Sequence, residues 1–288
     1  MKQYLSENTF SSPDFPVAVT RLRQRPSMPP HTHDFIELVI VAEGHSIHQF
    51  FTGENQAAYG LLQGDCFVVL PGEIHTYKES ENFVIYNVSF KEKVFCNLLP
   101  ELKQLPLWKN FFESAPSQNR QKRHLLPYEK VIAENFLKKI MQEFSCREPG
   151  FEFRIKLALL EVLCIIDRAN VVPWQPYASG PYSGILKTIN YMEKIKSQPF
   201  KLKYLAKMAN MSVSSYTKKF RDMTGDSPCE YFIGIKLENI RLDLLQTDLS
   251  VSELAEKYGF CDTSYMIRHF RRRLGISPLR YRNATKSK

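Results

Sequence analysis

A short internal repeat in the last third of the chain constrains the fold more strongly than any other feature of the sequence. The Leu-Ala pair that begins at Leu205 recurs at Leu254, and a longer pattern, F-x4-G-x-S-P-x2-Y, begins at Phe220 and again at Phe270, so the repeat is about 50 residues long. Each copy runs from a short helical segment through a tight turn to a second helical segment, then a glycine and Ser-Pro, which is the order of a helix-turn-helix. The sequence therefore predicts two related helix-turn-helix units in tandem.

Local signals support this prediction in both units. Ser212 and Asp262 stand where the second helices need N-caps, and Gly225 and Gly275 stand where those helices need left-handed C-terminal stops. The segment Pro228–Leu245 between the units has the apolar spacing of one continuous helix. At about 1.5 Å per residue it is long enough to hold two helices about 34 Å apart, the spacing of successive major grooves on one face of DNA. One chain could then contact two groove segments.

The basic residues of the chain are concentrated in the same region. Residues 184–288 contain 20 Lys and Arg against 10 Asp and Glu, whereas residues 1–183 contain 19 against 20. A folded basic domain favours a polyanionic partner such as nucleic acid; a basic surface that only increases solubility is the alternative. We expect Arg271, Arg272 and Arg273 to pair with phosphates. The full set of expected DNA contacts is Ser214, Thr217, Lys218, Thr263, Ser264, Arg268, Arg271 and Arg272.

The first hundred residues have the pattern of short antiparallel strands, which is typical of a small barrel or sandwich. The expected strands are Phe35–Val41, Ser46–Phe51, Asp65–Leu70 and Phe83–Phe90, and they are followed by amphipathic helices at Tyr128–Phe144 and Phe151–Arg168. A Pro- and Gly-rich stretch then indicates a linker. We expect a first domain over residues 1–170, a linker over 171–184 and a helical domain over 185–288.

Several classes of protein are not expected from this sequence. No run of about 18 apolar residues is present and Met1–Ser12 is polar, so neither a membrane span nor a secretory signal is predicted, and the expected location is the cytoplasm. The six cysteines are far apart without a C-x2-C pair, which argues against a zinc knuckle or a disulfide framework.

The segment Gly259–Arg282 resembles the signature of the AraC/XylS family of bacterial transcription regulators, which runs G-F, S-Y-F, F-K, G-x-S-P and Y-R. It departs from that signature at Met266, and the connecting helix departs from the family at Lys236 and Ile240. The resemblance implies a double helix-turn-helix domain that binds promoter DNA, and most members activate transcription by recruiting RNA polymerase. We also expect a homodimer, in which the helices Tyr128–Phe144 and Phe151–Arg168 form the paired surface.

Histidines in the first domain resemble the metal motif of the cupin barrels. His31 begins the pattern H-x-H-x3-E-x6-G, and a further histidine follows Pro71-Gly72, so the candidate metal ligands are His31, His33, Glu37 and His75. The second motif departs from the cupin enzymes, because six residues rather than five separate Gly64 from Pro71. We therefore expect no metal, no other cofactor and no enzymatic activity; a metal-dependent cupin enzyme is the alternative.

Other segments resemble the sugar-responsive members of the family: the loop Pro71–Tyr77 is similar to that of the arabinose regulator, and His33–Phe35 with Gly44, Ile47–Phe50 and Tyr86–Val88 is similar to the rhamnose regulators. A sugar site needs hydrogen-bonding groups and an aromatic face, and the candidate effector contacts are His33, Glu37, His48, His75, Tyr77 and Asn87. A regulator of virulence or stress that senses a fatty acid or bile-like molecule is the alternative, and it would need a more apolar cavity. The expected fold is α+β: an N-terminal cupin-like β-barrel with covering helices, which binds a small carbohydrate effector, and a C-terminal double helix-turn-helix.

Overall fold

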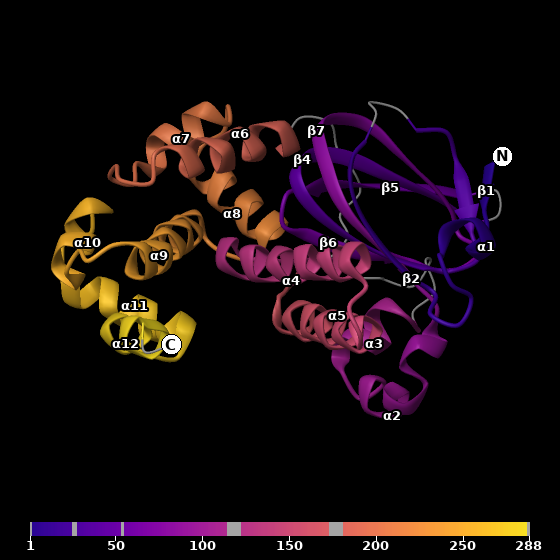
Figure 1. The fold of residues 1–288 in the computed structure, drawn as a ribbon. Helices are drawn as coiled ribbons and strands as arrows, with labels where there is room; N and C mark the ends of the chain where they lie inside the picture. The colour runs from indigo at the N-terminus through magenta and orange to yellow at the C-terminus, as the bar shows by residue number, and fades with distance from the viewer. Residues whose placement is uncertain (1, 25–27, 53–54, 114–121, 173–180, 287–288) are drawn as a thin grey trace. The chain divides into compact units, whose positions relative to one another are not determined.

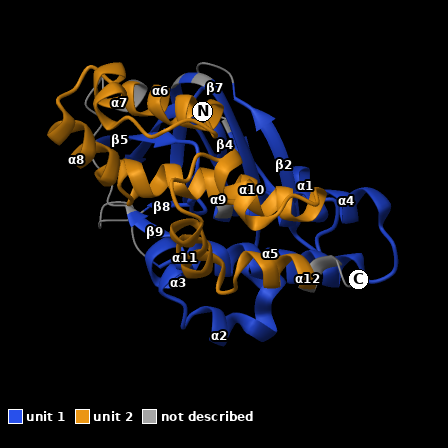
Figure 2. Ribbon diagram, turned by 90° about the vertical axis from the view of Figure 1, so that its left-hand side faces the viewer, with its two compact units in different colours: residues 1–182 blue, residues 183–288 orange. Residues whose placement is uncertain are grey.

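The computed structural model describes residues 2–24, 28–52, 55–113, 122–172 and 181–286. It divides into two compact units, Met1–Tyr182 and Ser183–Lys288 (Figure 2). Unit 1 is built around a β-sheet with helices beside it, and unit 2 is helical (Figure 1). The expected α+β fold is confirmed. Among the described helices, none is both long enough and apolar enough to span a membrane.

The described strands of unit 1 form one mixed sheet. Its longest strands, β4 and β7, pair antiparallel over most of their length; β2 also pairs with β7, and β5 and β6 pair with β4. In sequence order the strands are β1 Lys2–Tyr4, β2 Val17–Arg23, β3 His31–His33, β4 Ile36–Thr52, β5 Asn55–Leu62, β6 Asp65–Val69, β7 Ile74–Phe90, β8 Lys122–His124 and β9 Asn170–Val172.

The strand predictions were partly wrong. Two separate strands were expected on either side of Glu43-Gly44, but β4 runs through this point without a break. Its pairing with β7 shifts register three times between Val41 and Ile47, and Gly44 has a φ of 75°. Bulges therefore absorb the glycine and bend the strand where a turn was expected. Strands β2 and β5 were not predicted at all.

Alternation along the strands separates two apolar cores. Leu38 and Ile40 of β4 belong to the core shared with the helices, whereas Val39 and Val41 belong to a second core with residues of β5, β6 and β7. The helices of unit 1 are α1 Ser6–Thr9, the 3-10 helix η1 Glu92–Leu98, α2 Leu99–Leu102, α3 Pro106–Phe111, α4 Pro127–Cys146 and α5 Phe151–Arg168. The two long helices expected from the sequence are confirmed as α4 and α5, which pack against each other.

Unit 2 contains the two predicted helix-turn-helix pairs. Its helices are α6 Pro181–Lys194, α7 Leu202–Met208, α8 Val213–Thr224, α9 Pro228–Gln246, α10 Val251–Lys257, α11 Thr263–Leu274 and α12 Pro278–Lys286. The expected caps are confirmed: Ser212 Oγ accepts from the Ser215 N–H at 3.2 Å, and the Asp262 carboxylate accepts from two backbone N–H groups. Gly225 and Gly275 end α8 and α11 in the left-handed region.

The turns of the two pairs have the same backbone conformation. Asn210 and Gly259 occupy equivalent positions with φ of 55° and 61°. In each turn the residue that follows donates its N–H to an alanine carbonyl at 2.9 Å, namely Ala206 in the first pair and Ala255 in the second. The sequence repeat is therefore a repeat of structure.

Helix α9 packs against helices of both pairs, and it contacts α8, α10, α11 and α12. At its start the ring of Tyr231 meets that of Phe220 of α8, with ring centroids 5.3 Å apart. Further along, Ile240 and Leu244 lie in a core with Met266 and Phe270 of α11. One continuous helix thus supports both helix-turn-helix pairs of unit 2, as predicted. Of the expected linker, 173–180 lie outside the described residues.

Candidate functional site

A cavity of about 220 Å³ opens in unit 1. It is lined by Tyr4, Thr9, Ala18, Thr20, Leu22, Gln24, Met28, His31, His33, Phe35, Glu37, Tyr77, Asn87 and Ser89. Thr20 and Leu22 of β2 are exposed to solvent, so the cavity is accessible from this strand. Four of the six predicted effector contacts are among the lining residues: His33, Glu37, Tyr77 and Asn87.

The pairing of β4 with β7 brings Glu37 and Asn87 together. Glu37 is opposite Ser89 and Val39 is opposite Asn87, so Glu37 and Asn87 are diagonal neighbours on one face. Asn87 Nδ2 donates to Glu37 Oε1 at 2.5 Å. Burial raises the pKa of Glu37 to about 7, and this hydrogen bond opposes the rise. A nearby cation would be needed to keep this carboxyl fully ionised at neutral pH.

His33 is held as a neutral imidazole in one tautomer. Its Nδ1 lies 2.7 Å from the carbonyl oxygen of Phe35, which can only accept, so Nδ1 carries the proton and Nε2 keeps its lone pair. The imidazole also stacks on the Phe35 ring with centroids 4.6 Å apart. Burial lowers the pKa of His33 to about 4.

His75 and His48 form a buried chain beside the cavity. His75 Nδ1 lies 3.1 Å from His48 Nε2, and His48 Nδ1 lies 2.6 Å from the hydroxyl of Tyr59. His75 points its Nε2 toward Glu37, and His48 contacts the other ring nitrogen of His75; neither of these two predicted effector contacts is among the residues that line the cavity. His31 lines the cavity, and its ring lies 4.2 Å from that of His75.

Polar atoms are concentrated at this site without hydrogen-bond partners in the described protein. They are His33 Nε2, Glu37 Oε2, His75 Nε2, Tyr77 Oη and Asn87 Oδ1, and each is buried. Burial raises the pKa of Tyr77 well above its usual value, which keeps the hydroxyl a hydrogen-bond donor. Leaving such groups unpaired costs free energy, so the arrangement favours a polar ligand.

Sequence reasoning missed the contribution of β2 and of Tyr59. Ala18, Thr20 and Leu22 line the cavity, while Val17 and Val19 alternate with them and are buried in the core shared with the helices. This alternation with period two was a usable signal. The contact of Tyr59 with His48 had no signal, because it depends on the pairing of β5 with β4.

The predicted DNA contacts lie on α8 and α11. Ser214, Lys218, Ser264, Arg268, Arg271 and Arg272 are exposed, and Thr217 and Thr263 are half-buried. The Thr217 hydroxyl donates to the Val213 carbonyl at 2.9 Å, within its own helix. The Arg268 guanidinium lies 5.9 Å from the centre of the Tyr265 ring. The exposed part of α11 is therefore strongly basic.

Arg273 has a different position from the one expected. Its side chain is only 9% exposed, and its guanidinium donates to the Glu230 carbonyl oxygen at 2.8 Å and pairs with the Asp226 carboxylate at 3.4 Å. Arg273 thus joins the end of α11 to the start of α9, and the expectation of a phosphate contact was wrong for this residue. Arg272 pairs with Glu230 at 2.5 Å but is 62% exposed.

Comparison with known proteins identifies both units. The model of the AraC-like ligand binding domain matches residues 16–107, and that of a helix-turn-helix domain matches residues 205–284. The HTH-type transcriptional activator RhaR of Mannheimia succiniciproducens is 24% identical over 278 residues, 95% of this chain and 94% of the relative. RhaR of Cronobacter sakazakii is 24% identical over 275 residues, 93% of this chain and 92% of the relative. Among solved structures, the DNA-binding domain of AdpA in complex with a target DNA is 30% identical and covers 38% of this chain and 96% of that chain, with a TM-score of 0.35.

Proposed function

The chain belongs to the AraC family of transcription regulators, and from this membership we propose that it activates transcription when a small carbohydrate occupies the cavity of unit 1. The observation that carries the carbohydrate assignment is the group of buried polar atoms that lack hydrogen-bond partners in the described protein. The curated relatives named RhaR are described as transcriptional activators, which supports activation rather than repression.

The chemistry of the cavity suits a sugar better than a lipid. Glu37 and Asn87 offer acceptors, Tyr77 offers a donor, and the rings of Tyr4 and Phe35 offer apolar faces for C–H groups. A volume of about 220 Å³ lies below the usual range of about 300–1,000 Å³ for ligand pockets, which favours a compact ligand. A fatty acid would leave the buried polar atoms unpaired.

Unit 2 supplies the proposed DNA contacts. We place α8 and α11 in two successive major grooves, where Ser214, Thr217, Lys218, Thr263, Ser264 and Arg268 would contact bases and Arg271 and Arg272 would contact phosphates. Helix α9, which packs against both α8 and α11, supports this arrangement because it holds the two in one body.

The proposal extends to a dimer and to RNA polymerase. Phe153 and Leu157 on α5 are 65% and 48% exposed, and apolar side chains in such positions favour pairing with a second copy through α4 and α5. An activator of this family would then recruit RNA polymerase at the promoter, so we place its action in the cytoplasm.

The experiment combines ligand and DNA binding on the full chain. Melting temperature is measured with pentoses, hexoses, deoxyhexoses and fatty acids, and operator occupancy is measured by electrophoretic shift with each compound. We expect one sugar to raise the melting temperature and to change occupancy, because a ligand at about 100 times its dissociation constant adds about 2.7 kcal/mol to stability. Asn87→Leu should abolish the sugar response while DNA binding without sugar persists.

Arg21→Ala is the matched control, since Arg21 is an exposed β2 residue outside the cavity lining. It should leave the sugar response intact. Stabilisation by fatty acids with no response to any sugar would overturn the carbohydrate assignment. For the DNA arm, Arg268→Ala should relax the base preference at one operator position, and an unchanged preference would count against placing α11 in the groove.

A further inference from the structure

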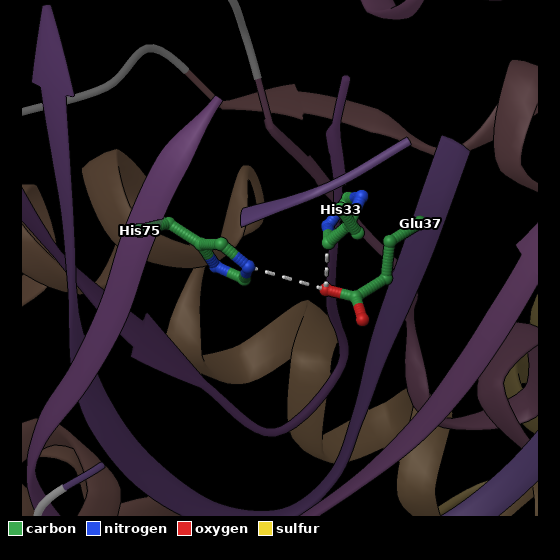
Figure 3. A group of neighbouring side chains, drawn as sticks. All are labelled: His33, Glu37 and His75. Atoms are coloured by element: carbon green, nitrogen blue, oxygen red, sulfur yellow. Dashed lines mark ion pairs between the residues drawn. The ribbon is translucent and has the colours of Figure 1, made fainter. Parts of the chain in front are cut away.

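The side chains of His33, Glu37 and His75 point toward one another (Figure 3). They lie beside the cavity, whose lining includes His33 and Glu37. His33 Nε2 lies 3.8 Å from Glu37 Oε2, His75 Nε2 lies 3.7 Å from the same oxygen, and all three atoms lie within 4.8 Å of one another. These separations are too long for hydrogen bonds. The three residues belong to three strands, β3, β4 and β7, so the sheet itself fixes their arrangement.

Each histidine presents a lone pair to this point. Nδ1 of His33 donates to the Phe35 carbonyl, which leaves Nε2 unprotonated in the neutral ring. Nδ1 of His75 is engaged with His48 Nε2, and His48 is in turn engaged with the Tyr59 hydroxyl. If His75 Nδ1 donates to His48 Nε2 and His48 Nδ1 donates to the Tyr59 hydroxyl oxygen, His75 has the same tautomer as His33 and its Nε2 is also unprotonated. Such a partner on the second ring nitrogen is the usual arrangement around a metal-bound histidine.

Glu37 presents one oxygen in the same way. Its Oε1 accepts from Asn87 Nδ2, and its Oε2 has no hydrogen-bond partner in the described protein. The carboxyl is buried, and among the described residues no Lys or Arg side chain lies within ion-pair distance of it; only the two imidazoles do. A bound cation would supply a positive charge and would satisfy all three buried atoms together.

The sequence led us to expect no metal, but on this geometry we propose that His33, Glu37 and His75 bind one divalent first-row transition-metal ion beside the cavity. Atoms with these separations lie at most about 2.4 Å from a common point, close to the bond lengths of about 2.0–2.2 Å for zinc with nitrogen and oxygen ligands. Two imidazoles and one carboxylate on one side of the ion leave positions open on the other. His31 lies outside this group, although the sequence motif included it.

His33 and Glu37 both line the cavity, so we place the open positions of the ion on that side. An effector with two adjacent hydroxyl groups can then bind the ion through both oxygens. This second part rests on the proposed function, whereas the ion site itself does not.

The test uses full-length protein that has been treated with a chelator and titrated with Co²⁺, read by its visible d–d absorption. We expect one equivalent to bind tightly, and Glu37→Gln or His75→Gln to weaken binding by more than about 100-fold. His45→Asn is the matched control, because His45 is a half-buried histidine of β4 outside this group and outside the cavity lining, and it should bind Co²⁺ within about threefold of the wild type. Melting curves identify any variant that fails to fold, and His33→Gln then replaces it.

His48→Phe tests the positioning chain, and it should weaken Co²⁺ binding by about 10- to 100-fold while the stoichiometry stays at one. Cys96, Cys146, Cys229 and Cys261 are exposed, so binding that shows only intense thiolate-to-cobalt charge transfer would belong to the surface and would overturn the proposal. Binding that is unchanged in Glu37→Gln, or lost in His45→Asn, would overturn it as well.

A sugar titration of the Co²⁺-loaded and metal-free forms separates the two parts. A shifted d–d spectrum and tighter sugar binding in the loaded form support coordination of the effector. Equal sugar affinity in both forms overturns that coordination but keeps the ion site. Sugar binding without any Co²⁺ site overturns the inference alone, whereas absence of sugar binding in both forms counts against the proposed function.

Discussion

Removing the carboxylate of Asp65 is expected to destabilise unit 1 more than any other single charge change in its described part. Asp65 is fully buried, and its oxygens accept from the Leu62 N–H at 2.8 Å, from Lys122 Nζ and from His124 Nδ1 at 2.8 Å. Lys122 is 2% exposed, so Asp65→Asn would leave an ammonium buried without a counter-charge. Breaking such a pair typically costs about 3–5 kcal/mol.

The loss of stability in Asp65→Asn should depend on Lys122 and on pH. Removing both charges in Asp65→Asn with Lys122→Met should recover part of the loss, because neither charge then remains buried. Burial alone would raise the pKa of Asp65, but the Lys122 charge and the His124 hydrogen bond outweigh it, so this pKa lies below its usual value. The stabilisation is therefore present above the unfolded pKa of 3.8 and is lost as the pH falls through the lower folded pKa.

Urea denaturation followed by tryptophan fluorescence measures this effect. Trp108 is buried in the core that the sheet of unit 1 shares with its helices, so its fluorescence reports on that unit. The difference in the free energy of unfolding between the wild type and Asp65→Asn should become smaller in acid. A loss below about 1 kcal/mol at pH 7, or a double variant as unstable as the sum of the single variants, would refute the reasoning.

Three further predictions follow from the site and from unit 2. In metal-free protein, burial raises the pKa of Glu37 from 4.5 to about 7, so the wild type loses stability as the pH rises from about 4.5 to about 7 and the loss levels off above that. The stability of Glu37→Gln relative to the wild type should therefore increase by about 2–3 kcal/mol between pH 5 and 8.5. Urea denaturation checks this, and a gap that does not vary with pH would contradict it. Arg273→Met should weaken operator binding without changing its salt dependence, whereas Arg271→Ala should lower the slope of log K against log salt by about 1; fluorescence anisotropy at several salt concentrations separates them, and equal slopes for both variants would be the contrary result. Gly259 has a φ of 61°, and a Cβ there would lie 2.6 Å from the Ser197 carbonyl oxygen. Gly259→Ala should therefore destabilise unit 2 by about 2 kcal/mol and lower its melting midpoint in circular dichroism. An unchanged midpoint would contradict this prediction.

The helical unit was largely predictable because its signals are local. A cap, a left-handed glycine and an apolar spacing each act within one or two turns, and the repeat shows each of them twice. Arg273 was the exception: its pairing with Asp226 and Glu230 depends on residues more than 40 positions away, and a run of three arginines gives no sign that one of them turns inward.

The sheet was less predictable because its strands depend on long-range pairing. Gly44 carries a turn signal, yet pairing with β7 on both sides of it keeps β4 continuous. The site shows the same limit. Alternation places His31 and His33 on one face of β3, and only the fold decides that His33 reaches Glu37, while the pairing of β5 with β4 brings Tyr59 to His48.

Helix α9 and the contacts of Arg273 together hold α8 and α11 at a fixed spacing in the DNA-binding unit. If α8 and α11 occupy successive grooves, a single base pair inserted between their target segments shifts one segment by about 3.4 Å along the axis and rotates it by about 34° around it. A hinge between α8 and α11 would accommodate such a change. Helix α9 is continuous, and the Arg273 guanidinium contacts its first turn, so it provides no hinge. Promoters that respond to this protein should thus vary more in the base sequence of the two target segments than in the number of base pairs between them.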